Sequence, residues 1–204
     1  MTERLLVVEG PDDKHVLWAI LKHHQFTPPF EIRDEGGFEN LLRRLSVHLK
    51  PGSDVEQLGI VVDADSQIQS RWKSLMNILK RSGYANVPDG PDHLGTLLAH
   101  EDLPRLGVWI MPDNTLPGML EDYLCFLVPA DDSLFVRAKQ CVGAIPAEER
   151  RFAEVHLTKA LIHTWLAWQD DPGTPLGQAI TKRYFDPEGP PVQSLLAWLA
   201  RLFA

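Results

Sequence analysis

Along residues 1–130, short continuous apolar runs alternate with segments in which apolar residues recur at helical spacing. The run 5–8 (LLVV) ends at Glu9-Gly10-Pro11 and is followed by helical spacing as far as Leu21. The run 58–62 (LGIVV) leads directly into Asp63-Ala64-Asp65. Continuous apolar runs of this length are typical of strands that are covered on both faces.

The same pattern predicts further strands over 30–32 and 106–111, helices over 38–49 and 68–82, and a helix that begins near Pro117. Residues 87–103 are rich in Pro, Gly and His and contain no predicted element. Strands that alternate with helices indicate an α/β fold with a mostly parallel sheet and right-handed crossovers.

Beyond about residue 130 the pattern predicts only helices, over 147–168, about 176–182, and 191–203. We therefore expect an α/β domain over 1–130 and a helical extension over 131–204 that packs on or beside it. The last helix is strongly apolar, so it should dock on the sheet domain; if left exposed, it would be a dimer or partner surface.

Acidic residues follow the predicted strands. Glu9 ends the first strand, Asp63 and Asp65 end the third, and Asp113 follows the last. Ligands of open α/β sheets bind beyond the carboxyl ends of the strands, and clustered carboxylates repel one another unless a cation lies between them. Oxygen ligands suit Mg²⁺ or Mn²⁺. Acids also end strands and cap helices for solubility alone, and Asp13 could simply favour a helix dipole.

Two motifs resemble a known family. Val8-Glu9-Gly10-Pro11-Asp12-Asp13 resembles the E-G-x-x-D signature of Toprim domains, and Val61-Val62-Asp63-Ala64-Asp65 resembles their D-x-D strand end. The resemblance covers about residues 1–130 and implies a Toprim (Rossmann-like) fold with a metal-binding phosphoryl-transfer site. Residues 111–114 (MPDN) and 117–122 (PGMLED) are most similar to small stand-alone Toprim proteins related to the overcoming-lysogenization-defect (OLD) nucleases.

This resemblance implies roles for particular residues. Glu9, Asp63 and Asp65 would bind a first ion, with Asp13 nearby, while Glu121, assisted by Asp113, would bind a second. Water would then hydrolyse a phosphodiester between the two ions. OLD-type nucleases also use a lysine after the Toprim core, and the sequence does not choose between Lys159 and Lys182.

The charge pattern allows a nucleic-acid partner without requiring one. The chain has 28 acidic and 20 basic residues and a formal net charge of -8, which argues against coating nucleic acid by bulk charge. Residues 66–86 nevertheless contain no acid. They include four basic side chains that could follow a phosphate backbone or simply be solvated: Arg71, Lys73, Lys80 and Arg81.

Other site classes have weaker support. Cys125 and Cys141 form no C-x-x-C pair, so we expect reduced, buried thiols rather than a disulfide framework or a zinc site. Among the histidines, His156 and His163 alone are spaced to share a helical face, and packing explains them better than metal binding. The sequence has neither a signal-like segment nor an apolar run of membrane-spanning length, so we expect no membrane association and a cytoplasmic location.

These observations favour a metal-dependent nuclease or related phosphodiesterase with Mg²⁺ or Mn²⁺ as cofactor. The alternative is a non-catalytic module that binds metal or phosphate and works with a separate ATPase subunit, because the sequence has no G-x-x-x-x-G-K-[ST] loop of its own. The oligomeric state stays open, with a homo-oligomer as one alternative.

Overall fold

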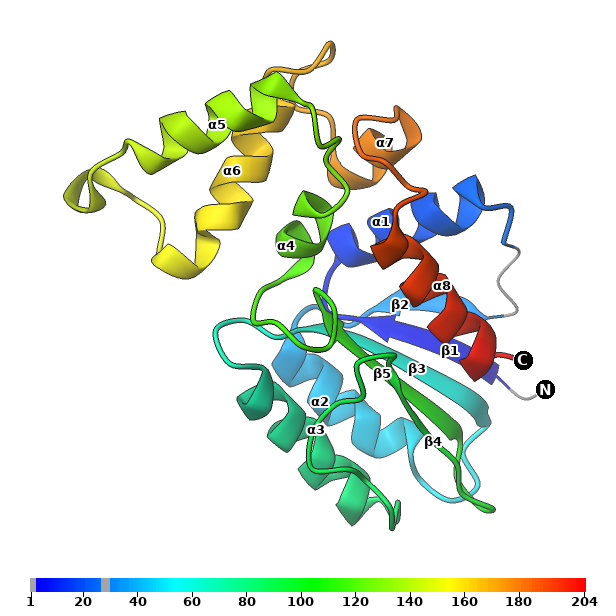
Figure 1. Ribbon diagram of the computed structural model, residues 1–204. Coiled ribbons are helices and arrows are strands. Elements are labelled where there is room, and N and C mark those ends of the chain that lie inside the picture. Colours follow the sequence, from blue (N-terminus) through cyan, green and yellow to red (C-terminus); the bar gives the residue numbers. More distant parts are fainter. Residues whose placement is uncertain (1–2, 27–29) are drawn as a thin grey trace.

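The computed structural model describes residues 3–26 and 30–204. Its centre is a five-stranded sheet of order β2-β1-β3-β5-β4 (Figure 1). The four strands β2, β1, β3 and β5 are parallel, and β4 pairs antiparallel with β5 at the edge. The strands are β1 (Glu3–Val8), β2 (Glu31–Asp34), β3 (Val55–Asp63), β4 (Thr96–Leu98) and β5 (Arg105–Met111). The predicted α/β fold with a mostly parallel sheet is confirmed.

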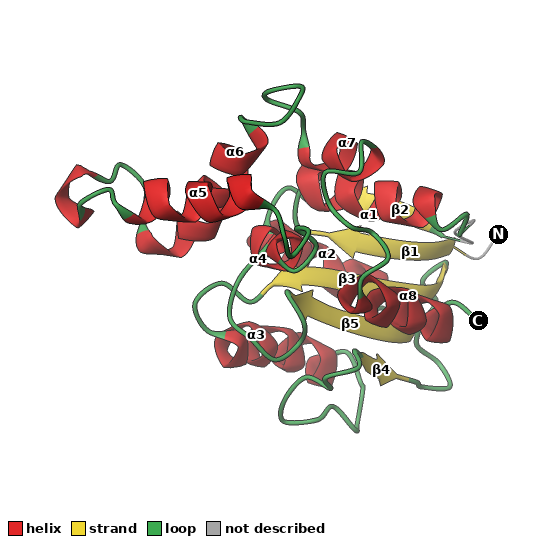
Figure 2. Cartoon of the chain, turned by 45° about the horizontal axis from the view of Figure 1, so that its top comes forward, coloured by secondary structure: helices red, strands yellow, loops and turns green. Residues whose placement is uncertain are grey.

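Helices flank both faces of this sheet. Helices α2 and α3 cover one face, while α1 and α8 cover the other (Figures 1 and 2). Helices α5 and α6 pack against each other and project beyond the sheet. The helices are α1 (Pro11–His23), α2 (Phe38–His48), α3 (Ile68–Arg81), α4 (Leu120–Cys125), α5 (Ser133–Gly143), α6 (Leu157–Leu166), α7 (Leu176–Thr181) and α8 (Pro190–Leu202), with 3-10 turns at Ala147–Glu149 and Glu154–His156.

The core consists of one apolar cluster on each face of the sheet. Alternate residues of β3 supply both clusters, because successive side chains of a strand point to opposite faces. Ile60 and Val62 belong to the cluster under α2 and α3, whereas Val61 belongs to the cluster under α1 and α8. This double coverage explains why the run 58–62 is continuously apolar.

The structure differs from the predicted elements in three places. Residues 87–103 contain β4, which is only three residues long and therefore gives no alternation to detect. Helix α5 lies in a region where we predicted no element. The predicted helix over 147–168 is broken, because Arg150 and Ala153 have extended backbones and only Leu157–Leu166 is α-helical.

Helix α8 docks on the sheet, as predicted, over two glycines that lie side by side in neighbouring strands. Gly59 of β3 pairs in register with Gly107 of β5. A Cβ atom at Gly107 would lie 2.6 Å from Leu202 Cδ2 and 3.0 Å from Trp198 Cζ2. The missing side chains therefore make the space in which α8 approaches the sheet backbone.

Gly107→Ala is expected to lower the free energy of unfolding by about 1–3 kcal/mol, because the added methyl group overpacks this contact. Urea denaturation would measure the change. Gly143→Ala is the matched control, since a Cβ there meets no atom within 4 Å. Equal stability of the two variants would contradict this view of the α8 contact.

The two cysteines differ in environment. Cys125 is partly buried, and this burial raises the pKa of its thiol to about 12. Cys141 is exposed on α5, so the expectation of a buried thiol was wrong for this residue. The sequence could not show this, because α5 was not predicted and its outer face could not be assigned.

Over residues 3–26 and 30–204, no helix combines the length and the apolar character needed to cross a membrane.

Candidate metal centre

A cavity of about 350 Å³ opens at the carboxyl ends of β1 and β3. Parallel sheets commonly bind ligands at this edge. Its walls come from the loop after β1, the start of α1, the loop before α2, the end of β3, α4 and α6. The lining residues are Glu9, Gly10, Pro11, Asp12, Asp13, Gly36, Gly37, Asp63, Leu120, Glu121 and Lys159.

Glu9 and Asp63 are joined directly across the ends of their two strands. The backbone N–H of Asp63 donates a hydrogen bond of 3.0 Å to Oε2 of Glu9. Burial raises the pKa of Glu9, although this hydrogen bond and the guanidinium of Arg71 act in the opposite direction. The acids that the sequence placed at the ends of the first and third strands are thus brought together in the cavity, because these strands are neighbours in the sheet.

Asp13 lies in the first turn of α1 and is only 6% exposed. Its Oδ2 accepts a hydrogen bond of 3.1 Å from the backbone N–H of Gly10, while its Oδ1 has no hydrogen-bond partner among residues 3–26 and 30–204. Burial, reinforced by the negative charge of Glu9, raises the pKa of Asp13 to about 7. Asp13 is therefore a cavity acid whose ionised form is disfavoured, and a nearby positive charge would stabilise that form.

Asp63 has the same character. Its Oδ1 is buried and has no hydrogen-bond partner in the part of the chain that the structure describes. Burial, with Asp13 and Glu9 adding negative charge, raises the pKa of Asp63 well above its ordinary value. Buried oxygens without partners are rare in folded proteins, and a bound cation would satisfy both of these.

Glu121 and Lys159, which also line the cavity, form an ion pair. Glu121 lies in the first turn of α4 and is 2% exposed, and Lys159 of α6 places Nζ 2.8 Å from its Oε1. Partial burial disfavours the charged lysine, but the hydrogen bond and the attraction from Glu121 raise the pKa of Lys159. Lys182, the other lysine candidate, lies elsewhere and pairs with Asp171.

Asp65 points away from this cavity into a neighbouring depression of about 280 Å³. Its carboxylate pairs with Arg71, whose guanidinium also lies 3.9 Å from Oε1 of Glu9 and 3.9 Å from the ring centre of Phe38. The backbone of Asp65 has a φ of 51° and pairs with Gly118. The two acids of the D-x-D motif therefore line different depressions, and Asp65 shares the guanidinium of Arg71 with Glu9.

Asp113 stabilises a turn. Its Oδ1 accepts hydrogen bonds of 2.9 and 2.8 Å from the backbone N–H groups of Thr115 and Leu116. It does not line the cavity with Glu121. The structure therefore does not bring Asp113 to the position that the resemblance implies for a second-ion ligand.

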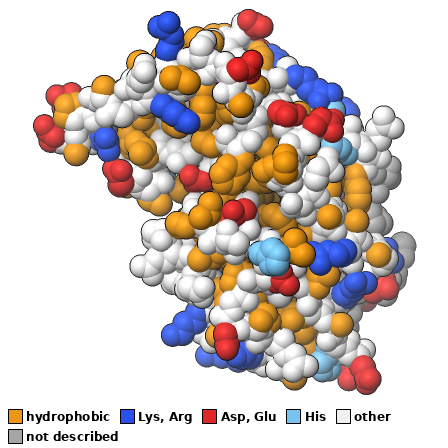
Figure 3. Space-filling view, viewed as in Figure 1, with side chains coloured by type: hydrophobic (Ala, Val, Ile, Leu, Met, Phe, Trp, Pro, Cys, Tyr) orange, Lys and Arg blue, Asp and Glu red, His pale blue; other side chains and the backbone are white. Residues whose placement is uncertain are grey.

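The four basic residues of 66–86 do not share one surface. Arg71 is held by Glu9 and Asp65, and the side chain is only 16% exposed. Lys73 lies about 200° further around the helix, because each helical residue turns by about 100°. Lys73, Lys80 and Arg81 are exposed. On the face shown in Figure 3, Lys and Arg side chains are spread over several regions rather than gathered into one band.

The cavity residues fit a divalent cation. Glu9, Asp13, Asp63 and Glu121 offer hard carboxylate oxygens, and two of these acids have buried oxygens without partners. Within the described ranges, however, the three potential ligands whose atoms all lie within 4.8 Å of one another are His23, His24 and Glu188, at another place. A cation in the cavity would therefore bind one or two of these acids directly and keep several waters, as Mg²⁺ commonly does.

Two features of the site were not recognised in the sequence. Gly37 lines the cavity, donates a backbone hydrogen bond of 2.7 Å to the carbonyl of Glu9, and has a φ of 111°. The pair Gly36-Gly37 before a predicted helix was the available signal. The sequence left Arg71 as either a phosphate contact or a solvated side chain, whereas in the structure it pairs with Asp65 and lies beside Glu9; its position six residues after Asp65 was the available signal.

Comparisons with known proteins concern the whole chain. The model of a family described as "Protein of unknown function (DUF3226)" matches residues 3–204. No curated protein matches the sequence. A solved structure of the C-terminal region of the Xanthomonas campestris pv. campestris OLD protein is similar, with 13% identity, a TM-score of 0.51, and coverage of 98% of this chain and 95% of that chain. A second structure of the same region has 14% identity, a TM-score of 0.45, and coverage of 98% and 94%.

Proposed function

We propose that this chain, which belongs to the DUF3226 family, is a metal-dependent nuclease or related phosphodiesterase with a Toprim-type acidic site. The observation that carries the proposal is the direct hydrogen bond between Asp63 N–H and Glu9 beside a cavity that also holds Asp13, Glu121 and Lys159. The E-G-x-x-D and D-x-D motifs supply three of these acids, Glu9, Asp13 and Asp63, and the fold similarity to the OLD protein region agrees with the resemblance of the sequence to that group.

In the proposed site, Asp13 and Asp63 would hold Mg²⁺ or Mn²⁺ through their buried oxygens, with water in the remaining positions and the Glu9 carboxylate beside them. The ion would supply Lewis acidity and neutralise charge on a phosphodiester. Arg71 and the Asp63 N–H hold Glu9 in place from two sides. Glu121 would be the ligand of a second ion. Lys159 would supply positive charge to the substrate phosphate.

The first test is cleavage of supercoiled plasmid, labelled single-stranded DNA and labelled RNA with Mg²⁺ or Mn²⁺. We expect wild-type activity that EDTA abolishes and that Glu9→Gln loses. Glu148→Gln is the matched control, because Glu148 is exposed in a 3-10 turn outside the cavity. Metal binding without cleavage of any substrate would reject the enzyme and favour the non-catalytic module that works with a separate ATPase.

Lys159→Gln is expected to slow cleavage by about 100-fold, because one charged donor to the reacting phosphate is lost. Steady-state cleavage rates at saturating Mg²⁺ would measure this effect. Lys50→Gln is the control, since Lys50 is exposed and lies outside the cavity. If Lys182→Gln lost activity and Lys159→Gln did not, the assignment of the lysine would be wrong.

A further inference from the structure

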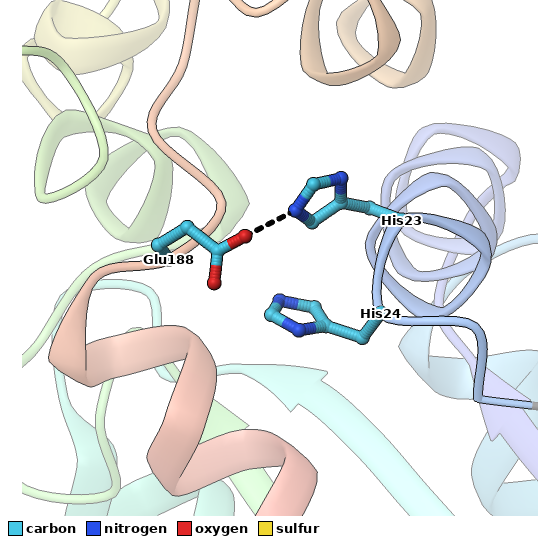
Figure 4. Close-up of side chains that lie close together, drawn as sticks. All are labelled: His23, His24 and Glu188. Atoms are coloured by element: carbon cyan, nitrogen blue, oxygen red, sulfur yellow. Dashed lines mark hydrogen bonds and ion pairs between the residues drawn. The ribbon is translucent and has the colours of Figure 1, made fainter.

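His23, His24 and Glu188 meet at a place outside the acidic cavity. His23 is the last residue of α1, His24 follows as its C-cap, and Glu188 lies in the loop just before α8. Nε2 of His23 is 2.5 Å from Oε1 of Glu188, although the residues are 165 positions apart. Figure 4 shows the two imidazole rings beside the carboxylate. One potential ligand atom from each residue lies within 4.8 Å of the other two.

The surroundings hold these three side chains in place. Nε2 of His24 lies 2.8 Å from the carbonyl oxygen of Pro187, a contact of the kind that orients metal-binding histidines. The backbone N–H of Glu188 donates a hydrogen bond of 2.9 Å to Oδ1 of Asp186, which fixes the loop. The C-terminal end of α1 carries partial negative charge, which favours a cation there.

The chemistry of the three ligands differs from that of the acidic cavity. Two imidazoles and one carboxylate form a common set for Zn²⁺ and leave a fourth position for water, whereas Mg²⁺ prefers oxygen ligands alone. The side chain of Glu188 is 60% exposed and that of His23 is 18% exposed, so an ion can reach the group from solution.

One neighbouring group opposes cation binding. Nη1 of Arg183 lies 3.1 Å from Nε2 of His23, the same nitrogen that faces Glu188. An ion at His23 would have to displace this guanidinium. Arg183 is exposed, so its side chain can turn into solvent. The arginine therefore lowers the affinity for a cation, and its removal makes a specific test.

We propose that His23, His24 and Glu188 bind one divalent transition-metal ion of the Zn²⁺ type, which ties the end of α1 to the loop that leads into α8. The ion adds a cross-link between segments that otherwise contact each other through the His23–Glu188 and His24–Pro187 interactions. It stabilises the docked position of α8 and is independent of the acidic cavity.

The test is calorimetric titration of the tag-free full chain with Zn²⁺, together with the visible absorption of the Co²⁺ form. Wild type should bind one ion at this site, His24→Gln and Glu188→Gln should each weaken binding by about 10-fold or more, and Arg183→Gln should tighten it. The Co²⁺ absorption should show nitrogen and oxygen ligands in tetrahedral geometry. Circular dichroism in EDTA checks that each variant is folded.

Asp63→Asn separates this site from the proposed catalytic one, because it changes the acidic cavity alone. Zn²⁺ binding should persist in Asp63→Asn, and Mg²⁺-dependent cleavage should persist in His24→Gln. Absence of Zn²⁺ binding by wild type, unchanged Zn²⁺ affinity in folded His24→Gln, or loss of Zn²⁺ binding in Asp63→Asn would each overturn the proposal.

Discussion

Asp63→Asn is expected to reduce metal-dependent cleavage by more than about 100-fold. The loss should exceed the 10- to 100-fold effect of removing an outer-shell partner, since Asp63 is proposed to contact the ion itself. The substitution keeps the shape of the side chain and the backbone N–H that binds Glu9, but it removes the charge from a carboxyl group with a buried, unpaired oxygen. Initial cleavage rates measured across a series of Mg²⁺ concentrations would show the loss.

Asp89→Asn serves as the matched control for this substitution. Asp89 is exposed in the segment between α3 and β4, and it does not line the cavity. Calorimetry should show that Asp63→Asn also loses Mg²⁺ affinity. Cleavage at the wild-type rate by Asp63→Asn at saturating Mg²⁺ would contradict the proposed site.

Asp13→Asn is expected to stabilise the metal-free protein at pH 8. The pKa of Asp13 rises from an ordinary value of 3.8 to about 7 in the folded state, so folding favours the protonated acid. The contribution of protonated Asp13 to the free energy of unfolding is fully present below its ordinary pKa and is lost as the pH rises through about 7. The difference of about three units between these two pKa values corresponds to about 4 kcal/mol, which is an upper limit for the gain in unfolding free energy of Asp13→Asn at pH 8.

Urea denaturation in EDTA at pH 5 and pH 8 would measure this effect. The stability difference between Asp13→Asn and wild type should be larger at pH 8 than at pH 5. Asp12→Asn is the control, because Asp12 is the exposed neighbour of Asp13. Saturating Mg²⁺ should stabilise wild type more than Asp13→Asn, since the ion needs the ionised carboxylate. If the unfolding free energies of Asp13→Asn and Asp12→Asn had the same pH dependence in EDTA, ionisation of Asp13 would not be what lowers the stability of wild type at high pH.

The sequence predicted the centre of the molecule well because β1, β3 and β5 are buried on both faces. Continuous apolar runs and the acids that follow them mark both the strands and their carboxyl ends. Glu9 and Asp63 come together because β1 and β3 are parallel neighbours. The order of the strands along the chain does not by itself show that β1 and β3 are neighbours in the sheet. The alternation of strands and helices makes this the expected arrangement.

Other parts of the site depend on backbone geometry and distant contacts that the pattern does not record. The positive φ of Asp65 directs its side chain to Arg71 rather than into the cavity with Asp63. Lys159 and Lys182 look alike in the sequence, and only the packing of α6 beside α4 distinguishes them. Glu188 lies 165 residues from His23, so no spacing rule connects them.

The ion pair between Lys159 and Glu121 means that the cavity already contains a positive charge of its own. A metal ion that binds Glu121 has to compete with this internal counterion, so the measured metal affinity would include the work of displacing the lysine. By thermodynamic reciprocity, any molecule that draws α6 away from α4 would tighten metal binding by the same factor by which the metal loosens that contact. Metal binding in the cavity would then loosen the contact between Lys159 and Glu121 and so affect how the projecting helices α5 and α6 are held.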